Sequence, residues 1–159
     1  MLLPKILRRT GFLTILAALA ITAWSCKDNN TMTGPDYSSV PAPYDTTGAQ
    51  HIALYNGLFY YQLDEGYGDI EANERDYVQV YYTMRYKSSG EIYSSSYANQ
   101  NTDPVSIRLG SSQTPIGISK GIAGMKKGGK RTIIIPPAMS FSGVSDTLVY
   151  DVKLADILL

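Results

Sequence analysis

Residues 114–137 constrain the fold of this chain more than any other stretch, because a helix pattern, a glycine pair and a strand pattern follow one another there. Thr114 is a residue type that caps helices, and Pro115 suits the first helical position. Three apolar side chains would then share one face of the helix: Ile118, Ile122 and Met125. This spacing predicts a short helix that packs on one side against the rest of the protein.

The turn after this helix contains the spacing of a phosphate-binding loop, G-x-x-x-x-G-K, from Gly124 to Lys130. The next residue is Arg131, at the position where a Ser or Thr hydroxyl would bind Mg²⁺. The order of elements is also inverted, because a phosphate-binding loop follows a strand and begins a helix, whereas this turn leads into the strand pattern Arg131–Ile135. The stretch therefore predicts a helix, a turn and a strand, and it argues against nucleotide binding.

Apolar and polar residues alternate on both sides of this unit, which is typical of strands with one buried face. The alternation occurs in four runs: residues 59–63, 78–86, 105–109 and 148–154. In the last run the apolar side chains would point inward, while Asp151 and Lys153 would point outward. Together these patterns predict an antiparallel sheet over one short helix, which is an α+β fold.

The charges of the chain are unevenly distributed along it. The sequence has 14 basic and 14 acidic residues, but three of the basic ones are Lys5, Arg8 and Arg9, and all the acidic ones follow Cys26. Without residues 1–26 the balance is 11 basic against 14 acidic residues, a net charge of −3. A nucleic-acid-binding protein would need a basic face, so the composition argues against that class.

Residues 1–26 have the pattern of a secretory signal, with a basic start and the apolar run Phe12–Ala23. The run is shorter than the about 20 residues that a spanning helix needs. It ends just before Cys26, the only cysteine, in a context that resembles the lipobox of bacterial lipoproteins. We therefore expect a lipid on Cys26 that anchors the protein to the outer membrane, at its periplasmic face or at the cell surface. An ordinary cleaved signal or a short anchor is the alternative.

Residues 27–56 predict a flexible linker, because they are rich in Asn, Thr, Ser, Gly and Pro and offer little to bury. A turn or two of helix could form within His51–Asn56. His51 is the only histidine, and no second histidine or nearby cysteine could complete a site with it, so we expect no metal. The globular domain would span residues 57–159.

Six separated segments of that domain carry a resemblance to a known family: Val78–Thr83, Gly90–Tyr97, Leu109–Gly110, Gly117–Met125, Gly128–Pro137 and Leu148–Leu154. In order and spacing they resemble FKBP-type peptidyl-prolyl isomerases. The resemblance implies a curved antiparallel sheet of five or six strands wrapped around the helix, with the active site in an apolar hollow between them. It also implies a monomer that acts on proline-containing polypeptides and needs no cofactor. The N-terminal pattern adds the exported, lipid-anchored members of the family.

The resemblance also implies which residues form the site. The catalytic positions would be Tyr82, Tyr93, Ser94 and Tyr150, and the substrate-binding positions Val105, Thr114, Pro115, Ile116, Ile118 and Phe141. Several of these residues depart from the family pattern, since Ser94 replaces an Asp, Ile118 a Trp and Phe141 a Tyr. Pro115 falls where the family uses a backbone N–H, which proline lacks, although a shift of one residue would place Ile116 there.

Two functions follow from this mixture of retained and altered positions. The first is a lipid-anchored prolyl isomerase that assists the folding of exported proteins. The second is a binding module that keeps the fold without the chemistry, as part of a membrane-associated assembly. The aromatic residues at these positions could also simply fill a core, as aromatic side chains on a strand face usually do.

Overall fold

The computed structural model of the chain describes residues 34–158. The predicted signal and Cys26 therefore lie outside the described residues. Within residues 34–158, no helix is long and apolar enough to cross a membrane.

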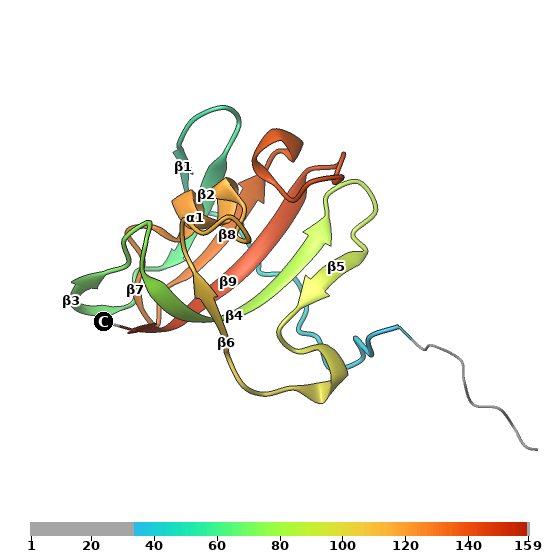
Figure 1. The fold of residues 1–159 in the computed structure, drawn as a ribbon, viewed down its shortest axis with the longest axis horizontal. Helices are drawn as coiled ribbons and strands as arrows, with labels where there is room; N and C mark the ends of the chain where they lie inside the picture. The colour runs from blue at the N-terminus through green and yellow to red at the C-terminus, as the bar shows by residue number, and fades with distance from the viewer. Residues whose placement is uncertain (1–33, 159) are drawn as a thin grey trace, which may run out of the picture. The chain divides into compact units, whose positions relative to one another are not determined.

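Antiparallel strands form the main sheet, as the alternating runs predict (Figure 1). Its strands follow in the spatial order β1 (Gln50–Ala53), β2 (Phe59–Asp64), β8 (Lys130–Ile135), β9 (Leu148–Leu158), β4 (Tyr77–Tyr86) and β5 (Ile92–Ser95), and β6 (Val105–Arg108) also pairs with β4. A second sheet pairs β3 (Tyr67–Glu71) with β7 (Lys126–Lys127), and two short 3-10 helices span Ala98–Gln100 and Pro137–Met139. The α+β fold with one α-helix in the described part of the chain is confirmed.

The helix α1 (Ile116–Ile122) packs on the face of the sheet that carries the predicted inward residues of β4 and β9. Two glycines allow this close approach. A Cβ atom built on Gly117 would lie 2.5 Å from the Cγ2 atom of Ile135, and one built on Gly121 would lie 2.6 Å from the Cδ1 atom of Ile133. Only glycine at these positions lets the helix backbone rest directly on β8.

The predicted cap of α1 is wrong in one respect. Pro115 is the cap residue itself, and no side chain bonds to the first N–H groups of the helix. The Thr114 hydroxyl instead donates a hydrogen bond of 2.7 Å to the carbonyl oxygen of Arg108, which fastens the loop before α1 to β6. The predicted inward face of the helix is confirmed, since Ile118, Ile122 and Met125 are all buried.

Arg131 of β8 fixes the other end of the helix. Its Nη1 atom donates hydrogen bonds of 2.8 Å to the carbonyl oxygens of both Gly121 and Ala123. Its Nε atom donates to the Oε1 atom of Gln62 at 2.8 Å, and its guanidinium lies 4.0 Å from the ring centre of Tyr60. A buried cation thus satisfies the carbonyl groups that end a helix, which such ends require.

The prediction of a flexible linker is wrong for the part of it that follows residue 35. Residues 36–44, which we call the strap, lie along the face of the sheet opposite α1, the back face (Figure 1). The Asp36 N–H donates to the Oδ1 atom of Asn99 at 2.9 Å, and the Ser39 hydroxyl donates to the carbonyl oxygen of Tyr97 at 2.8 Å. The helix expected within residues 51–56 is also absent, because residues 50–53 form β1 and pair with β2.

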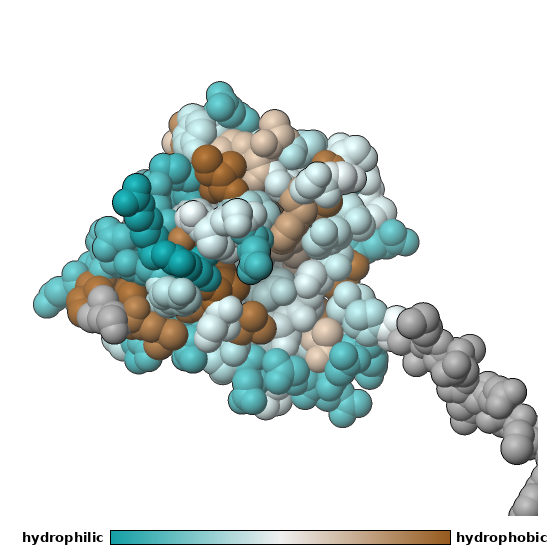
Figure 2. Space-filling view, viewed as in Figure 1, coloured by the Kyte–Doolittle hydropathy of each residue, from teal (hydrophilic) through white to brown (hydrophobic). Residues whose placement is uncertain are grey.

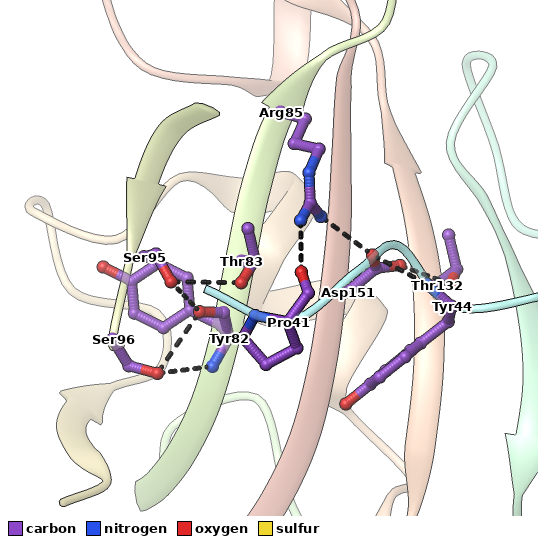
Figure 3. A network of polar contacts seen from close by, with 9 residues as sticks. All are labelled: Pro41, Tyr44, Tyr82, Thr83, Arg85, Ser95, Ser96, Thr132 and Asp151. Atoms are coloured by element: carbon purple, nitrogen blue, oxygen red, sulfur yellow. Dashed lines mark hydrogen bonds and ion pairs between the residues drawn. The ribbon is translucent and has the colours of Figure 1, made fainter. Parts of the chain in front are cut away.

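A buried ion pair lies under the strap (Figure 3). The Nη1 atom of Arg85 donates to the Oδ2 atom of Asp151 at 3.2 Å, and its Nη2 atom donates to the carbonyl oxygen of Pro41 at 2.7 Å. Asp151 also accepts bonds from the Thr132 hydroxyl and the Tyr44 N–H. Asp151 does point away from the core, as predicted, but the strap covers it. Burial also raises the pKa of Tyr44 to about 12, which keeps its hydroxyl protonated.

Exposed hydrophobic side chains gather over β3 and the end of β9, at the left of Figure 2. Ile70, Tyr67 and Leu158 are among them. This surface lies away from α1 and its loop.

Candidate functional site

A hollow of about 180 Å³ lies between α1 and the main sheet. Its walls come from three places: β4 and β9 on one side, the loop before α1 and the helix on another, and the segment after Pro137–Met139 on the third. The lining residues are Tyr82, Met84, Ile107, Gln113, Thr114, Pro115, Ile118, Phe141 and Tyr150. Six of these nine residues are among those that the sequence predicts at the site.

Tyr82 and Tyr150 stand beside one another on adjacent strands and form one wall. Their ring centres are 5.3 Å apart and their planes are tilted by 37°. Tyr150 is 1% exposed, and its burial, with Tyr82 close by, raises its pKa well above the ordinary value of 10. The hydroxyl of Tyr150 therefore stays neutral throughout the physiological pH range, and this wall offers aromatic surface without a negative charge.

Ser94 holds the hydroxyl of Tyr82 in place. The Tyr82 Oη and Ser94 Oγ atoms are 3.0 Å apart and form a hydrogen bond in which either can donate. The backbone of Tyr82 is fixed as well, because its N–H donates to the Ser96 hydroxyl at 2.9 Å and its carbonyl accepts from the Ser95 hydroxyl at 3.1 Å (Figure 3). The sequence places both residues at the site, and the structure adds the hydrogen bond between them.

Tyr93 lies behind the hollow and supports Phe141. Their ring centres are 5.5 Å apart, and Tyr86 meets Tyr93 edge-on at the same separation. Phe141 lines the hollow, whereas Tyr93 does not. The phenyl ring of Phe141 adds apolar surface but no hydrogen-bond donor.

The loop before α1 places Thr114 and Pro115 on the rim of the hollow, while Ile116 points elsewhere. Because the lining residue is Pro115 itself, the chain has no N–H group at that place. The Ile116 side chain lines a separate groove and is 51% exposed, and the alternative in which the backbone N–H of Ile116 serves as the donor stays a prediction.

Val105 does not line the hollow, in contrast to its predicted role. It pairs with Val80 at the end of β6, and Ile107, two residues further on, supplies that wall. The prediction also missed Met84 and Gln113. Met84 and Ile107 both lie on the inward faces of their strands, so the alternation of apolar and polar residues could have predicted them. No sequence pattern predicts Gln113 at the site.

The glycine-rich turn after α1 is occupied by contacts within the protein. The Gly124 N–H donates to the carbonyl oxygen of Ala72 at 2.8 Å, the Gly128 N–H to that of Leu154 at 2.7 Å, and the Gly129 N–H to that of Lys126 at 3.0 Å. These are the groups that a phosphate-binding loop would present to its ligand. Among residues 34–158, no three His, Cys, Asp or Glu side chains gather in a way that could hold a metal ion.

A sheet wrapped on a short helix, with an aromatic hollow between them, matches one family of proteins. The family model of FKBP-type peptidyl-prolyl cis-trans isomerases matches residues 68–155, more than half of the chain. The chain belongs to this family.

Similar proteins come from several kinds of organism. The chain is 33% identical over 136 residues to the photosynthetic NDH subunit of lumenal location 4 of Arabidopsis thaliana, an alignment that covers 72% of this chain and 61% of that protein. It is 35% identical over 96 residues to the peptidyl-prolyl cis-trans isomerase FPR2 of Saccharomyces cerevisiae, covering 55% and 70%. The crystal structure of FkpA from Escherichia coli superimposes with a TM-score of 0.57 at 30% identity, covering 67% of this chain and 51% of that one.

Proposed function

We propose that this chain is a peptidyl-prolyl cis-trans isomerase that acts on proline-containing polypeptides and assists the folding of exported proteins. The hollow between α1 and the sheet carries this proposal. Its walls are aromatic and aliphatic, and the rings of Tyr82, Tyr150 and Phe141 face a space of about 180 Å³.

The reaction requires rotation about an X–Pro peptide bond, which resonance opposes with a barrier of about 18–20 kcal/mol. In the twisted transition state the amide has lost its conjugation and is less polar than the planar ground state. An apolar hollow therefore stabilises the twisted form relative to the planar one, because the less polar twisted amide loses less solvation when it moves from water into the hollow. Tyr82, Tyr150, Ile118 and Phe141 would surround the prolyl ring, and no nucleophile is needed.

The polar groups at the hollow would hold the flanking backbone of the substrate. When Ser94 donates to the Tyr82 hydroxyl, the proton of Tyr82 is left to donate to a substrate carbonyl at the wall. Pro115 on the rim offers no N–H, and Phe141 offers no hydroxyl. A hydrogen bond contributes about 0.5–1.5 kcal/mol, so each missing donor lowers the rate by at most about tenfold.

The proposal is tested by measuring cis–trans isomerisation of a proline peptide with the full chain. We expect acceleration that Tyr82→Ala reduces about tenfold or more, while Tyr77→Ala, an exposed tyrosine on the same strand outside the hollow, leaves the rate unchanged. No acceleration at high protein concentration would overturn the proposal.

A second candidate function is a binding module that kept the hollow without the catalysis. Pro115 on the rim favours it, because the position lacks a donor. The relative from Arabidopsis thaliana, which is named as a subunit of a larger complex, is consistent with such a role. This candidate predicts that proline peptides bind to the full chain, with loss of binding in Tyr82→Ala, but isomerise at the uncatalysed rate.

We also propose that the protein is anchored by a lipid on Cys26 to the outer membrane, at its periplasmic face or at the cell surface. The basic start, the apolar run and the single cysteine at its end support this. Cys26→Ser should release the protein from the membrane fraction of a bacterial host, whereas equal retention of both proteins would contradict the anchor.

A further inference from the structure

A second groove, of about 350 Å³, adjoins the hollow on the other side of the loop before α1. Its walls include Glu74, Arg75, Ser111, Thr114, Ile116 and Lys120, and we call it the α1 groove. Thr114 lines both the hollow and the α1 groove. The two depressions therefore meet at Thr114.

The ridge at Thr114 is firmly held. The Thr114 hydroxyl donates to the carbonyl oxygen of Arg108 at 2.7 Å and lies 3.1 Å from the Ser111 hydroxyl. The Gly110 N–H donates to the Ser119 hydroxyl at 2.9 Å, which joins the loop to α1. A ridge with these bonds needs little ordering when a ligand binds, so contacts across it cost little entropy.

Ile116 gives the α1 groove an apolar contact surface. Its side chain is 51% exposed, although its neighbours two and six residues along, Ile118 and Ile122, are buried in the core. An exposed isoleucine at the edge of a depression can cover an apolar side chain of a ligand.

The α1 groove also offers a cation. Lys120 and Glu74 form an ion pair with each other across the groove. Arg75, beside them, has no carboxylate within 4.0 Å among residues 34–158. A guanidinium in this position can bind a carboxylate through two parallel hydrogen bonds.

We propose that the α1 groove is an extended substrate site: a polypeptide whose proline occupies the hollow crosses the ridge at Thr114, packs an apolar side chain on Ile116 and places a carboxylate on Arg75. This inference rests on the function proposed for the hollow. An extended chain advances about 3.3–3.6 Å per residue, and because the two depressions meet at Thr114, the groove would be reached within a few residues of the proline. The protein would then favour proline sites in longer chains with nearby apolar and acidic residues.

The test uses two peptides. The short one is a tetrapeptide that contains one proline, and the long one has twelve residues and extends that tetrapeptide on both sides with leucine and glutamate. The measured quantity is the ratio of kcat/KM for the long peptide to that for the short one, on the full chain. We expect a ratio of about five to ten for the wild type, reduced towards one by Ile116→Ser. The matched control is Ile70→Ser, because Ile70 is 53% exposed but lies on β3, outside both depressions.

Arg75→Gln tests the charge. With the wild type, replacing glutamate by lysine in the long peptide should lower kcat/KM about threefold or more, and Arg75→Gln should abolish this difference. A ratio near one in the wild type, or equal losses in Ile116→Ser and Ile70→Ser, would overturn the proposal.

The proposed substrate site can still be tested if the hollow does not catalyse isomerisation. In that case the tetrapeptide is not isomerised, which contradicts the proposed function alone. The Kd of a fluorescently labelled long peptide, measured by anisotropy, then decides the inference. Weaker binding to Ile116→Ser than to Ile70→Ser supports the α1 groove as a polypeptide site, and equal binding overturns it.

Discussion

Arg85 and Asp151 form an ion pair of 3.2 Å on the back face of the sheet, with side chains that are 10% and 5% exposed. Breaking a buried pair by removing one partner leaves an uncompensated charge and costs about 3–5 kcal/mol. Arg85→Met should lower the free energy of unfolding, measured with urea, by about that amount. Lys127→Met is the control, because the pair of Lys127 with Asp156 is exposed to solvent. Similar losses in both variants would contradict the role of burial.

Asp151 should make the free energy of unfolding depend on pH, with a larger stabilising contribution at low pH than at neutral pH. Burial raises the pKa of Asp151 above its ordinary value of 3.8, against the opposing effects of the Thr132 hydroxyl, the Tyr44 N–H and Arg85. The folded protein therefore binds this proton more tightly than the unfolded chain. The resulting stabilisation is complete below the unfolded pKa and is lost as the pH rises through the folded pKa.

The measurement is the difference in unfolding free energy between the wild type and Asp151→Asn, followed from about pH 7 to about pH 4. We expect the difference to move in favour of the wild type as the pH falls. Asp146→Asn should show little change over this range, because the hydrogen bonds from Ser88 lower the pKa of Asp146 below 3.8, and its contribution is lost only as the pH falls further. A flat difference for Asp151→Asn would contradict this prediction.

Gly117→Ala should destabilise the protein, although alanine in a helix is normally more favourable than glycine by about 0.8–1.0 kcal/mol. The added Cβ atom would lie 2.5 Å from the Cγ2 atom of Ile135 and 2.9 Å from the carbonyl oxygen of Met139. Overpacking costs about 1–3 kcal/mol, and so close a contact with Ile135 and a backbone oxygen should cost about 2–3 kcal/mol, so we expect a net loss of about 1–2 kcal/mol and a lower Tm. An unchanged or higher Tm would show that α1 does not rest on β8 as tightly as the distances indicate.

The hydrogen bond between the hydroxyls of Tyr82 and Ser94 should matter for activity as one unit. Ser94→Ala and Tyr82→Phe should each lower kcat/KM by about two- to tenfold, and the double variant should lose little more than either alone. The measurement is the proline-peptide assay, with circular dichroism as the check on folding. Ser106→Ala, an exposed serine on β6, is the matched control. Fully additive losses would mean that the two hydroxyls act separately.

The strands that face the core were predictable from the sequence, because burial on one face imposes alternation. Leu148, Tyr150, Val152 and Leu154 are all buried, as their spacing indicates. The helix was predictable because burial on one face imposes a helical spacing on its apolar residues. Ile107 was within reach of the same argument, since it has the inward orientation that makes it a wall of the hollow.

The strap was not predictable, because its residues carry no period and its bonding partners are distant in sequence. The Tyr44 N–H binds a carboxylate 107 residues away, and the Pro41 carbonyl accepts from a guanidinium 44 residues away. Proline- and serine-rich composition indicates a linker whether or not such partners exist. The role of Arg131 at the end of α1 was not predictable either, since nothing in the sequence of a strand indicates that one of its arginines binds the carbonyl groups of a helix.

Because side chains alternate along a strand, β4 sends Tyr82 to one side and Arg85 to the other. The hollow and the N-terminal segment therefore have separate sides of the sheet. A polypeptide bound in the hollow, as proposed above, would therefore leave residues 36–44 in place on the back face.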